Sequence, residues 1–302
     1  MSPLILALSG SELLAKQIAE LASIPQGVVE SRRFPDCETY LRIDSDCVQK
    51  SVVIVCTLDR PDDKLLPLVF LADAARQLGA FRVGLVAPYL AYMRQDRRFR
   101  QGEAVTSRTF AGLLSRYFDW LVTIDPHLHR YSSLGQIYQV PNRIVHAAPA
   151  LAEWIGGHVN RPVLVGPDEE SAQWIADVAT RAGAPYVVLR KNRRGDRAVE
   201  VSVPDVDVYR RHTPVVVDDI VSSAQTMVET VRQLVQAGLR APVCVGVHAL
   251  FSSEAEQALR EAGASQIVTT TSVPHRTNGI DIVPLLIPAI REFALSTAVP
   301  GL

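Results

Sequence analysis

Short runs of apolar, often β-branched residues alternate with helical segments along the whole chain. The runs are almost continuously apolar, which is typical of strands covered on both faces of a sheet. A helix between two such strands connects parallel neighbours, so the pattern predicts an α/β fold with mostly parallel sheets. We expect strands at 4–8, 52–56, 83–87, 121–124, 163–165, 186–189, 215–217, 243–247 and 267–269, and helices at 11–22, 62–78, 106–118, 169–182, 224–237, 254–262 and 283–295.

Two stretches of the chain repeat one strand–helix–strand unit. Residues 52–87 and 215–247 each contain two apolar runs and a helical segment with Arg-Gln-Leu near its end. The 302 residues match two domains at roughly 150 residues each. We therefore expect two similar α/β domains, although any two such units can also resemble each other by chance. Pro and Asn interrupt the pattern at 141–149, where we expect the boundary.

Composition narrows the classes of function. Lys and Arg total 31 against 32 Asp and Glu, and this balance argues against a general nucleic-acid or membrane-surface role. No apolar run approaches the ~18 residues of a membrane span, and the first residues lack the basic leader of a signal peptide. None of the four cysteines forms a C-x-x-C pair. We expect a cytoplasmic protein with reduced thiols and neither a zinc nor a redox motif.

The sharpest local signal follows the apolar run at 215–217. Two carboxylates, Asp218 and Asp219, come first, and small or polar residues then lead into a helix. Ligands of parallel sheets bind at the carboxyl ends of strands, and a helix N-terminus with nearby hydroxyls binds anions. The carboxylates can accept hydrogen bonds from a sugar diol, so the segment predicts a sugar-phosphate site. The alternative is an ordinary N-cap with solvated aspartates.

Four further segments have residues suited to phosphate chemistry. The stretch 190–197 has five basic residues around Gly195, and we expect a movable loop whose charge stabilises a phosphoryl transition state. Arginines and aromatic residues alternate at 89–103, where they can bind phosphate and stack on a base. The cluster at 125–129 has an Asp and two His at a strand end, and Asp168 follows another strand. For each segment, a solvated or structural role is the alternative.

Together these segments resemble the ribose-phosphate diphosphokinases, also called phosphoribosyl pyrophosphate synthetases, along nearly the whole chain and in the family's order. Neither a P-loop nor a Rossmann fingerprint is present, so a bound nucleotide is held in another way. In chain order the matching segments are Arg33-Phe-Pro-Asp-Cys-Glu, Pro88-Tyr-Leu-Ala-Tyr-Met-Arg-Gln-Asp, Asp125-Pro-His, Gly166-Pro-Asp, Lys191-Asn-Arg and Asp218-Asp-Ile-Val-Ser-Ser-Ala-Gln-Thr.

The resemblance implies a role for each matching residue. Lys191 and Arg193 are the implied catalytic pair, and His127 and Asp168 the implied Mg²⁺ ligands. The first segment, which implies ATP binding from a neighbouring subunit, contributes Phe34, Asp36 and Glu38, and the second contributes Arg94, Gln95 and Asp96. The implied ribose-5-phosphate residues are Asp218, Asp219, Ser222, Ser223, Ala224, Gln225 and Thr226.

The same resemblance implies two pseudo-duplicated domains of phosphoribosyltransferase type, at 1–146 plus 283–302 and at 147–282. It implies transfer of the diphosphoryl group of ATP to the C1 hydroxyl of ribose 5-phosphate, giving phosphoribosyl pyrophosphate and AMP. Self-association into at least a dimer is expected because a neighbour completes the ATP site. Two alternatives stay open: a phosphoribosyltransferase that consumes phosphoribosyl pyrophosphate, and a non-catalytic, regulatory homologue.

The chain departs from the family's usual pattern at several positions. Cys37 and Gln225 stand where the family usually has Gly, and Ser222 and Ser223 replace an Asp and a Thr. A left-handed conformation at Gln225 would cost on the order of 1 kcal/mol because Gln has a Cβ. The turn therefore either takes a helical φ at Gln225 or is strained and binds the 5-phosphate more weakly.

Overall fold

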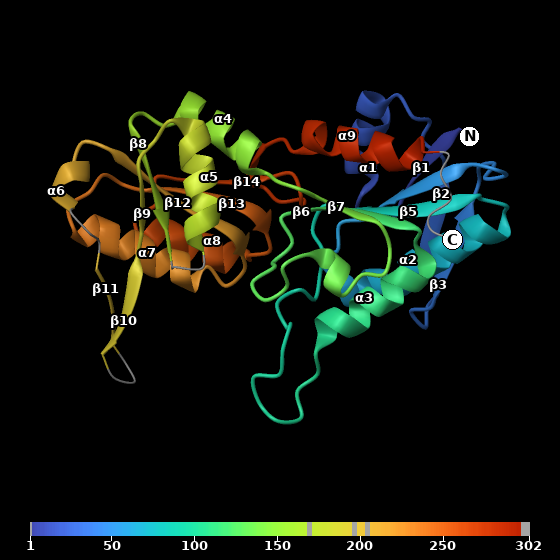
Figure 1. Cartoon of the computed structure of the whole chain (residues 1–302), viewed down its shortest axis with the longest axis horizontal. Helices are drawn as coiled ribbons and strands as arrows, with labels where there is room; N and C mark the ends of the chain where they lie inside the picture. Colours follow the sequence, from blue (N-terminus) through green and yellow to red (C-terminus); the bar gives the residue numbers. More distant parts are fainter. Residues whose placement is uncertain (1, 168–170, 195–197, 203–205, 297–302) are drawn as a thin grey trace. The chain divides into compact units, whose positions relative to one another are not determined.

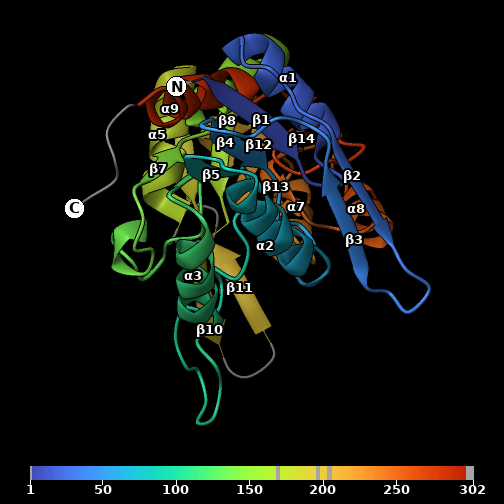
Figure 2. The same cartoon turned by 90° about the vertical axis from the view of Figure 1, so that its right-hand side faces the viewer.

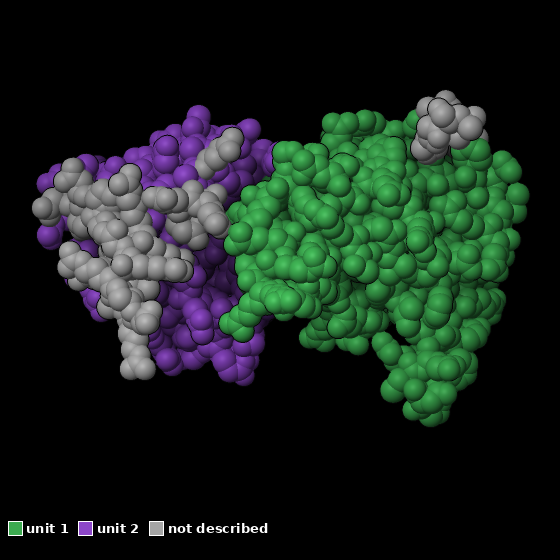
Figure 3. All heavy atoms as spheres, turned by 60° about the horizontal axis from the view of Figure 1, so that its bottom comes forward, with its two compact units in different colours: residues 1–145, 283–302 green, residues 146–282 purple. Residues whose placement is uncertain are grey.

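The structure is a computed structural model that describes residues 2–167, 171–194, 198–202 and 206–296 (Figure 1). The chain divides into two compact units, residues 1–145 with 283–302 and residues 146–282 (Figure 3). The first boundary lies one residue before the expected one. Across the described residues, no helix is long and apolar enough to cross a membrane.

Unit 1 is built on a five-stranded, fully parallel sheet in the order β1-β4-β5-β6-β7. The sheet strands are β1 (Pro3–Ala7), β4 (Ser51–Val55), β5 (Arg82–Ala87), β6 (Trp120–Ile124) and β7 (Asn142–Val145). The helices are α1 (Glu12–Ala22), α2 (Pro61–Gln77), α3 (Thr106–Tyr117) and α9 (Val283–Ala294), with a short 3-10 turn at Leu134–Gln136.

The final helix is fixed to unit 1 by specific contacts. The ring of Trp120 stacks on Phe293 of α9 at 5.2 Å, and Nη1 of Arg82 donates to the Phe293 carbonyl at 3.1 Å. Trp120 has room because residue 84 is Gly: a Cβ there would lie 1.9 Å from the indole. These packing partners explain why α9 belongs to unit 1 although it follows unit 2 in the chain.

Unit 2 is built on a six-stranded parallel sheet in the order β15-β14-β13-β12-β8-β9. Its strands are β8 (Pro162–Gly166), β9 (Tyr186–Val188), β12 (Thr213–Val221), β13 (Val243–Ala249), β14 (Gln266–Thr270) and β15 (Asn278–Ile280). Its helices are α4 (Ala148–His158), α5 (Ala172–Ala182), α6 (Val206–Tyr209), α7 (Gln225–Gln236) and α8 (Ser253–Glu261).

Each unit also has a two-stranded antiparallel hairpin outside its main sheet. These are β2 (Val29–Arg33) with β3 (Thr39–Ile43) in unit 1, and β10 (Arg190–Arg194) with β11 (Ala198–Ser202) in unit 2. Figure 2 shows the β2–β3 hairpin extending away from the sheet of unit 1. The sequence predicted no strand in either hairpin, because neither hairpin has the long apolar run that identifies strands buried in a sheet.

The two units share one topology. The order β1-β4-β5-β6-β7 in unit 1 corresponds to β8-β12-β13-β14-β15 in unit 2, and each hairpin lies between the first two strands of its series. The parallel α/β fold and its internal duplication are therefore confirmed. β12 was predicted at 215–217 but spans Thr213–Val221, and β13, predicted at 243–247, extends to Ala249. The sequence predicted neither the strands β7 and β15 nor the helices α4 and α6.

Candidate active site

The predicted sugar-phosphate segment lies at the carboxyl end of β12. Because this strand continues through Val221, Asp218 and Asp219 lie within it and do not follow its end. Asp218 pairs with Gly246 of β13, and its carboxylate accepts from the Asp219 N–H at 3.0 Å. Asp219 accepts in turn from the Ile220 N–H at 2.8 Å. Both carboxylates are half-buried and thereby held beside the turn that follows.

The turn from β12 into α7 leaves a helix N-terminus without a side-chain cap. Ala224, the N-cap residue, has φ +57° and makes no side-chain cap hydrogen bond. Ser223 and Thr226 are exposed beside it, and Ser222 is half-buried. Uncapped backbone N–H groups at a helix start, next to hydroxyls, are suited to a phosphate.

The same turn settles the question raised by Gln225. Gln225 is the first residue of α7, and the left-handed conformation falls on Ala224 instead. Of the two outcomes left open, the structure has the helical one, and Gln225 causes no left-handed strain. The reason for expecting weaker 5-phosphate binding at Gln225 therefore disappears.

The turn of the β2–β3 hairpin contains the first group of predicted ATP residues. Phe34, Asp36 and Glu38 are all exposed, and the Phe34 N–H donates to the Glu38 carbonyl at 2.8 Å. Cys37 has φ +72°, which explains why Gly is usual there. The Arg32 guanidinium lies 4.6 Å from the Phe34 ring centroid, so the exposed ring already has one cationic neighbour.

The second predicted ATP segment follows β5 and is joined to the hairpin through α2. The Tyr92 hydroxyl donates to Asp62, and this hydrogen bond raises the pKa of Tyr92. Nη2 of Arg33, at the end of β2, donates to the Asp63 carbonyl at 3.3 Å. The first turn of α2 thus contacts both segments.

Within the second segment, the three predicted residues differ in exposure. Arg94 is exposed, and Gln95 is half-buried with its Oε1 accepting from the Thr106 hydroxyl at 3.1 Å. Asp96 is buried, and both of its carboxylate oxygens accept from Nη1 of Arg130, at 3.0 and 3.1 Å. The sequence did not single out Arg130, although it directly follows the predicted His cluster.

The loop after β6 places two imidazoles side by side. Asp125 has φ +31°, and the rings of His127 and His129 meet edge to face at 3.8 Å. Mg²⁺ prefers oxygen ligands and is commonly bound through one or two carboxylates and substrate phosphates. Within unit 2, the half-buried carboxylates of Asp218 and Asp219 fit that chemistry.

The predicted catalytic segment forms a hairpin strand over Arg190–Arg194, where we expected a loop. Lys191 and Arg193 belong to β10, opposite Val201 and Val199 of β11. An antiparallel partner strand fixes the backbone of these residues by ladder hydrogen bonds. Asp168, the second predicted Mg²⁺ ligand, lies outside the described residues.

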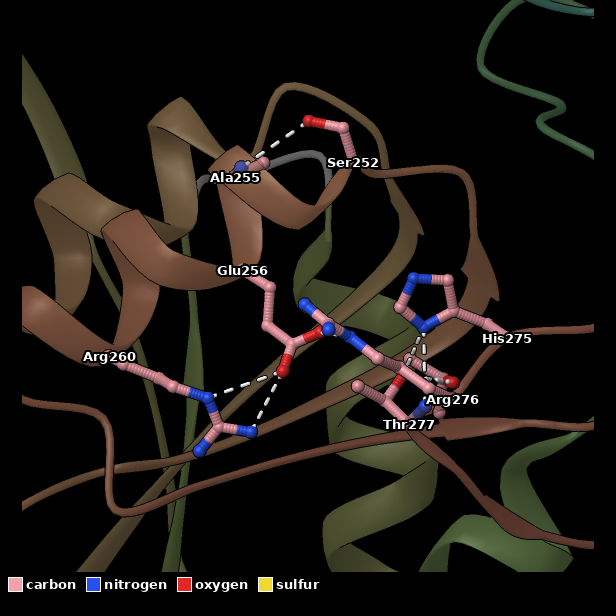
Figure 4. A network of polar contacts seen from close by, with 8 residues as sticks. Ser252, Ala255, Glu256, Arg260, His275, Arg276 and Thr277 are labelled. Atoms are coloured by element: carbon pink, nitrogen blue, oxygen red, sulfur yellow. Dashed lines mark hydrogen bonds and ion pairs between the residues drawn. The ribbon is translucent and has the colours of Figure 1, made fainter.

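In unit 2 the loop after β14 is tied to α8 by a buried carboxylate (Figure 4). Oε1 of Glu256 accepts from Nη2 of Arg260 at 2.8 Å, and Oε2 accepts from Nε of Arg276 at 2.6 Å. Burial by itself would raise the pKa of Glu256, but the two guanidinium hydrogen bonds outweigh it and lower this pKa. Unlike α7, α8 has a side-chain cap, the Ser252 hydroxyl, which accepts from the Ala255 N–H.

Comparison with known proteins agrees with the fold and the motifs. Residues 133–282 match the phosphoribosyl transferase domain, which agrees with the parallel α/β fold of unit 2. Residues 4–117 match the N-terminal domain of ribose phosphate pyrophosphokinase. The chain belongs to the ribose-phosphate pyrophosphokinase family, as its motifs predicted.

Individual relatives resemble the chain over almost its full length. The ribose-phosphate pyrophosphokinase of Methanopyrus kandleri is 33% identical over 294 residues, covering 96% of this chain and 99% of the relative. That of Saccharolobus solfataricus is 31% identical over 93% of this chain and 96% of the relative. The crystal structure of phosphoribosylpyrophosphate synthetase from Mycobacterium smegmatis superposes with a TM-score of 0.85 at 24% identity, covering 96% of this chain and 98% of that one. The predicted fold and enzyme family are both confirmed.

Proposed function

We propose that the protein transfers the diphosphoryl group of ATP to the C1 hydroxyl of ribose 5-phosphate, with release of AMP. The turn after β12 is the observation that supports this reaction most directly. It combines two half-buried carboxylates, Asp218 and Asp219, with the uncapped N-terminus of α7. The carboxylates suit the ribose hydroxyls, and the helix N-terminus suits the 5-phosphate.

In this proposal ATP is bound by residues of unit 1. Arg94 and Gln95 follow β5, and Phe34, Asp36 and Glu38 belong to the exposed hairpin turn. The C1 hydroxyl attacks the β-phosphorus in line, and AMP is the leaving group. Phosphoryl transfer depends chiefly on positioning and on stabilisation of developing charge, the roles that we assign to Lys191 and Arg193.

Mg²⁺ belongs to the proposal as the ion that neutralises phosphate charge when bound. We assign its protein ligands to His127 and Asp168, with Asp218 and Asp219 close to the sugar hydroxyls. Carboxylate oxygens and substrate phosphates are the ligands that Mg²⁺ commonly takes in proteins, and carboxylates beside a proposed phosphate turn provide this combination.

Self-association is part of the same proposal. The β2–β3 turn presents Phe34, with 39% of its surface exposed, together with Asp36 and Glu38. We infer that this turn completes the ATP site of a second copy of the chain. Sedimentation velocity combined with an activity assay tests this inference, since a fully active monomer would contradict it.

We also propose a cytoplasmic location. The four cysteines are free, which suits a reducing compartment.

One assay tests the reaction against both alternatives. The protein is mixed with ATP, Mg²⁺ and ribose 5-phosphate, and AMP and phosphoribosyl pyrophosphate are measured. We expect both products in equal amounts. Turnover only with phosphoribosyl pyrophosphate and a base would favour a phosphoribosyltransferase, and no turnover with either set would favour a non-catalytic homologue.

A further inference from the structure

We propose that Arg130 contacts the phosphates of ATP and that Asp96 is its positioning residue and not itself a nucleotide ligand. This inference rests on the proposed function and refines its ATP site. It reverses the assignment drawn from the sequence, where Asp96 was the predicted ligand and Arg130 had no role. The two side chains lie 34 residues apart in the chain and meet only in the folded unit.

The Asp96 carboxylate faces the protein interior. Only 2% of its side chain is exposed, and both oxygens accept from Nη1 of Arg130. The Tyr131 hydroxyl donates to the Asp96 carbonyl at 3.1 Å, and the Ser107 hydroxyl lies 3.1 Å from the same Tyr131 oxygen. A carboxylate held in this way has little surface to offer a ligand.

Arg130 presents the complementary situation. Its side chain is 38% exposed, and within the described part of the chain its hydrogen bonds are made by Nη1 alone. The donors Nε and Nη2 remain for an anion outside the pair. Guanidinium donors form charge-assisted hydrogen bonds to phosphate oxygens, and fixing one edge on Asp96 orients the rest in advance.

The surroundings of Arg130 fit a nucleotide and not an isolated anion. Phe99 is 54% exposed. The guanidinium of Arg130 lies 5.5 Å from the centroid of the Phe99 ring, and the guanidinium of Arg97 lies 4.8 Å from the same centroid. Oε2 of Glu103 accepts from the N–H groups of Phe99 (2.7 Å) and Arg100 (3.0 Å), so the loop is held by its own side chain. An exposed aromatic face beside two cations is suited to a base and its phosphates.

The location within unit 1 supports the same conclusion. Asp96 lies in the loop after β5, and Arg130 lies in the loop after β6, three residues beyond His127. The strands β5 and β6 are parallel neighbours, so their carboxyl ends share one edge of the sheet. That edge is where α/β sheets bind ligands.

The test compares steady-state kinetics and equilibrium ATP binding of single and double variants. Loss of a charge-assisted phosphate contact in Arg130→Ala should raise the KM for ATP about tenfold or more. We expect the KM for ribose 5-phosphate to stay within about twofold, since that substrate is assigned to unit 2. Asp96→Asn should raise the KM for ATP through Arg130, and the double variant should be no weaker than Arg130→Ala alone.

Matched variants keep the proposal falsifiable. Arg143→Ala removes a more exposed Arg–carboxylate pair of the same unit, with Glu292, and should leave the KM for ATP unchanged. Arg130→Lys keeps the charge without the planar fork and should fall between wild type and Arg130→Ala. Additive losses for Asp96→Asn and Arg130→Ala would make Asp96 a direct ligand and overturn the proposal. A lower melting temperature with unchanged ATP binding would also overturn it. A wild-type protein without AMP formation would instead contradict the proposed function.

Discussion

Five strands have the same order in the two units, with β9 as an additional edge strand of unit 2, but the turns after the second strands differ. In unit 2 the turn after β12 is made of small residues and ends at an α7 N-terminus without a side-chain cap. In unit 1 the equivalent turn after β4 ends at Arg60, and α2 also lacks a side-chain cap, but Asp62 and Asp63 lie in its first turn. Carboxylates at a helix N-terminus already complement its positive dipole end, so this end is unsuited to an anion.

In unit 1, the turn after β4 also contains the ammonium group of Lys64. Nζ of Lys64 donates to the Thr57 carbonyl at 2.9 Å and to the Asp59 carboxylate, and both side chains are largely buried. In unit 1 the equivalent turn is thus closed by its own side chains, whereas in unit 2 it is the proposed phosphate turn. In this proposal, side chains at a few positions, and not the shared fold, determine which turn is suited to an anion.

The largest expected effect concerns the hairpin of unit 2. Lys191→Ala should lower kcat by about 10²-fold or more, with a smaller change in the KM for ATP, because the lysine acts mainly on the transition state. Lys191→Arg, which keeps the charge, should retain more activity. Steady-state kinetics measure both constants. A near-wild-type kcat in Lys191→Ala would contradict the catalytic role that we assign to this hairpin and not to the hairpin of unit 1.

The left-handed residue of the phosphate turn provides the next test. Ala224→Val places a β-branched residue at φ +57°, so we expect a stability loss of about 2 kcal/mol and a several-fold higher KM for ribose 5-phosphate. Gln225→Val, at the exposed first residue of α7, is the control and should change this KM little. Equal effects at both positions would show that the turn does not depend on the conformation of Ala224.

Lys64→Met tests the closed turn of unit 1. The variant leaves Asp59, whose side chain is 21% exposed, without its ammonium partner, so we expect a loss of about 1–2 kcal/mol in chemical denaturation. The KM for ribose 5-phosphate should not move, because this turn has no assigned ligand. A raised KM for that substrate would mean that the unit 1 turn shares the phosphate function.

The anchored loop after β14 corresponds to the loop of Arg130 after β6, and its carboxylate gives a pH signature. Since the folded pKa of Glu256 lies below its usual 4.5, its charge stabilises the fold above that pH. This stabilisation is lost as the pH falls through the folded pKa. Glu256→Gln should therefore be less stable than wild type by about 1 kcal/mol at neutral pH, with a gap that closes in acid. A gap independent of pH would contradict the assignment of charge to Glu256.

The smallest expected effect compares the two positions where Gly is usual. Cys37→Gly should stabilise the protein by about 0.5 kcal/mol, because it removes left-handed strain at φ +72°. Gln225→Gly should destabilise it by about 0.5 kcal/mol, because Gly is a weaker helix former. Thermal unfolding of both variants measures the signs, and stabilisation by Gln225→Gly would contradict the position of the left-handed residue.

The sequence by itself determined the class of fold and the segments that bear on function. The apolar runs of β4, β5 and β6 are typical of strands buried on both faces, and these three strands were located to within one residue at each end. The proposed phosphate turn could be predicted from the sequence because its residues are contiguous. Its strand–turn–helix chemistry is a local property, and local properties can be derived from neighbouring residues.

Tertiary structure alone decided how individual side chains are used. Pairing with β13 extends β12 through Val221 and thereby sets which residue of the turn is left-handed, Ala224 and not Gln225. The Asp96 carboxylate turns inward because Arg130 arrives from a neighbouring strand's loop. The two hairpins form because each strand pairs with an antiparallel partner outside the main sheet. Each outcome depends on a contact between residues that are not adjacent in the chain. Composition and periodicity describe neighbouring residues only, so they cannot predict such contacts.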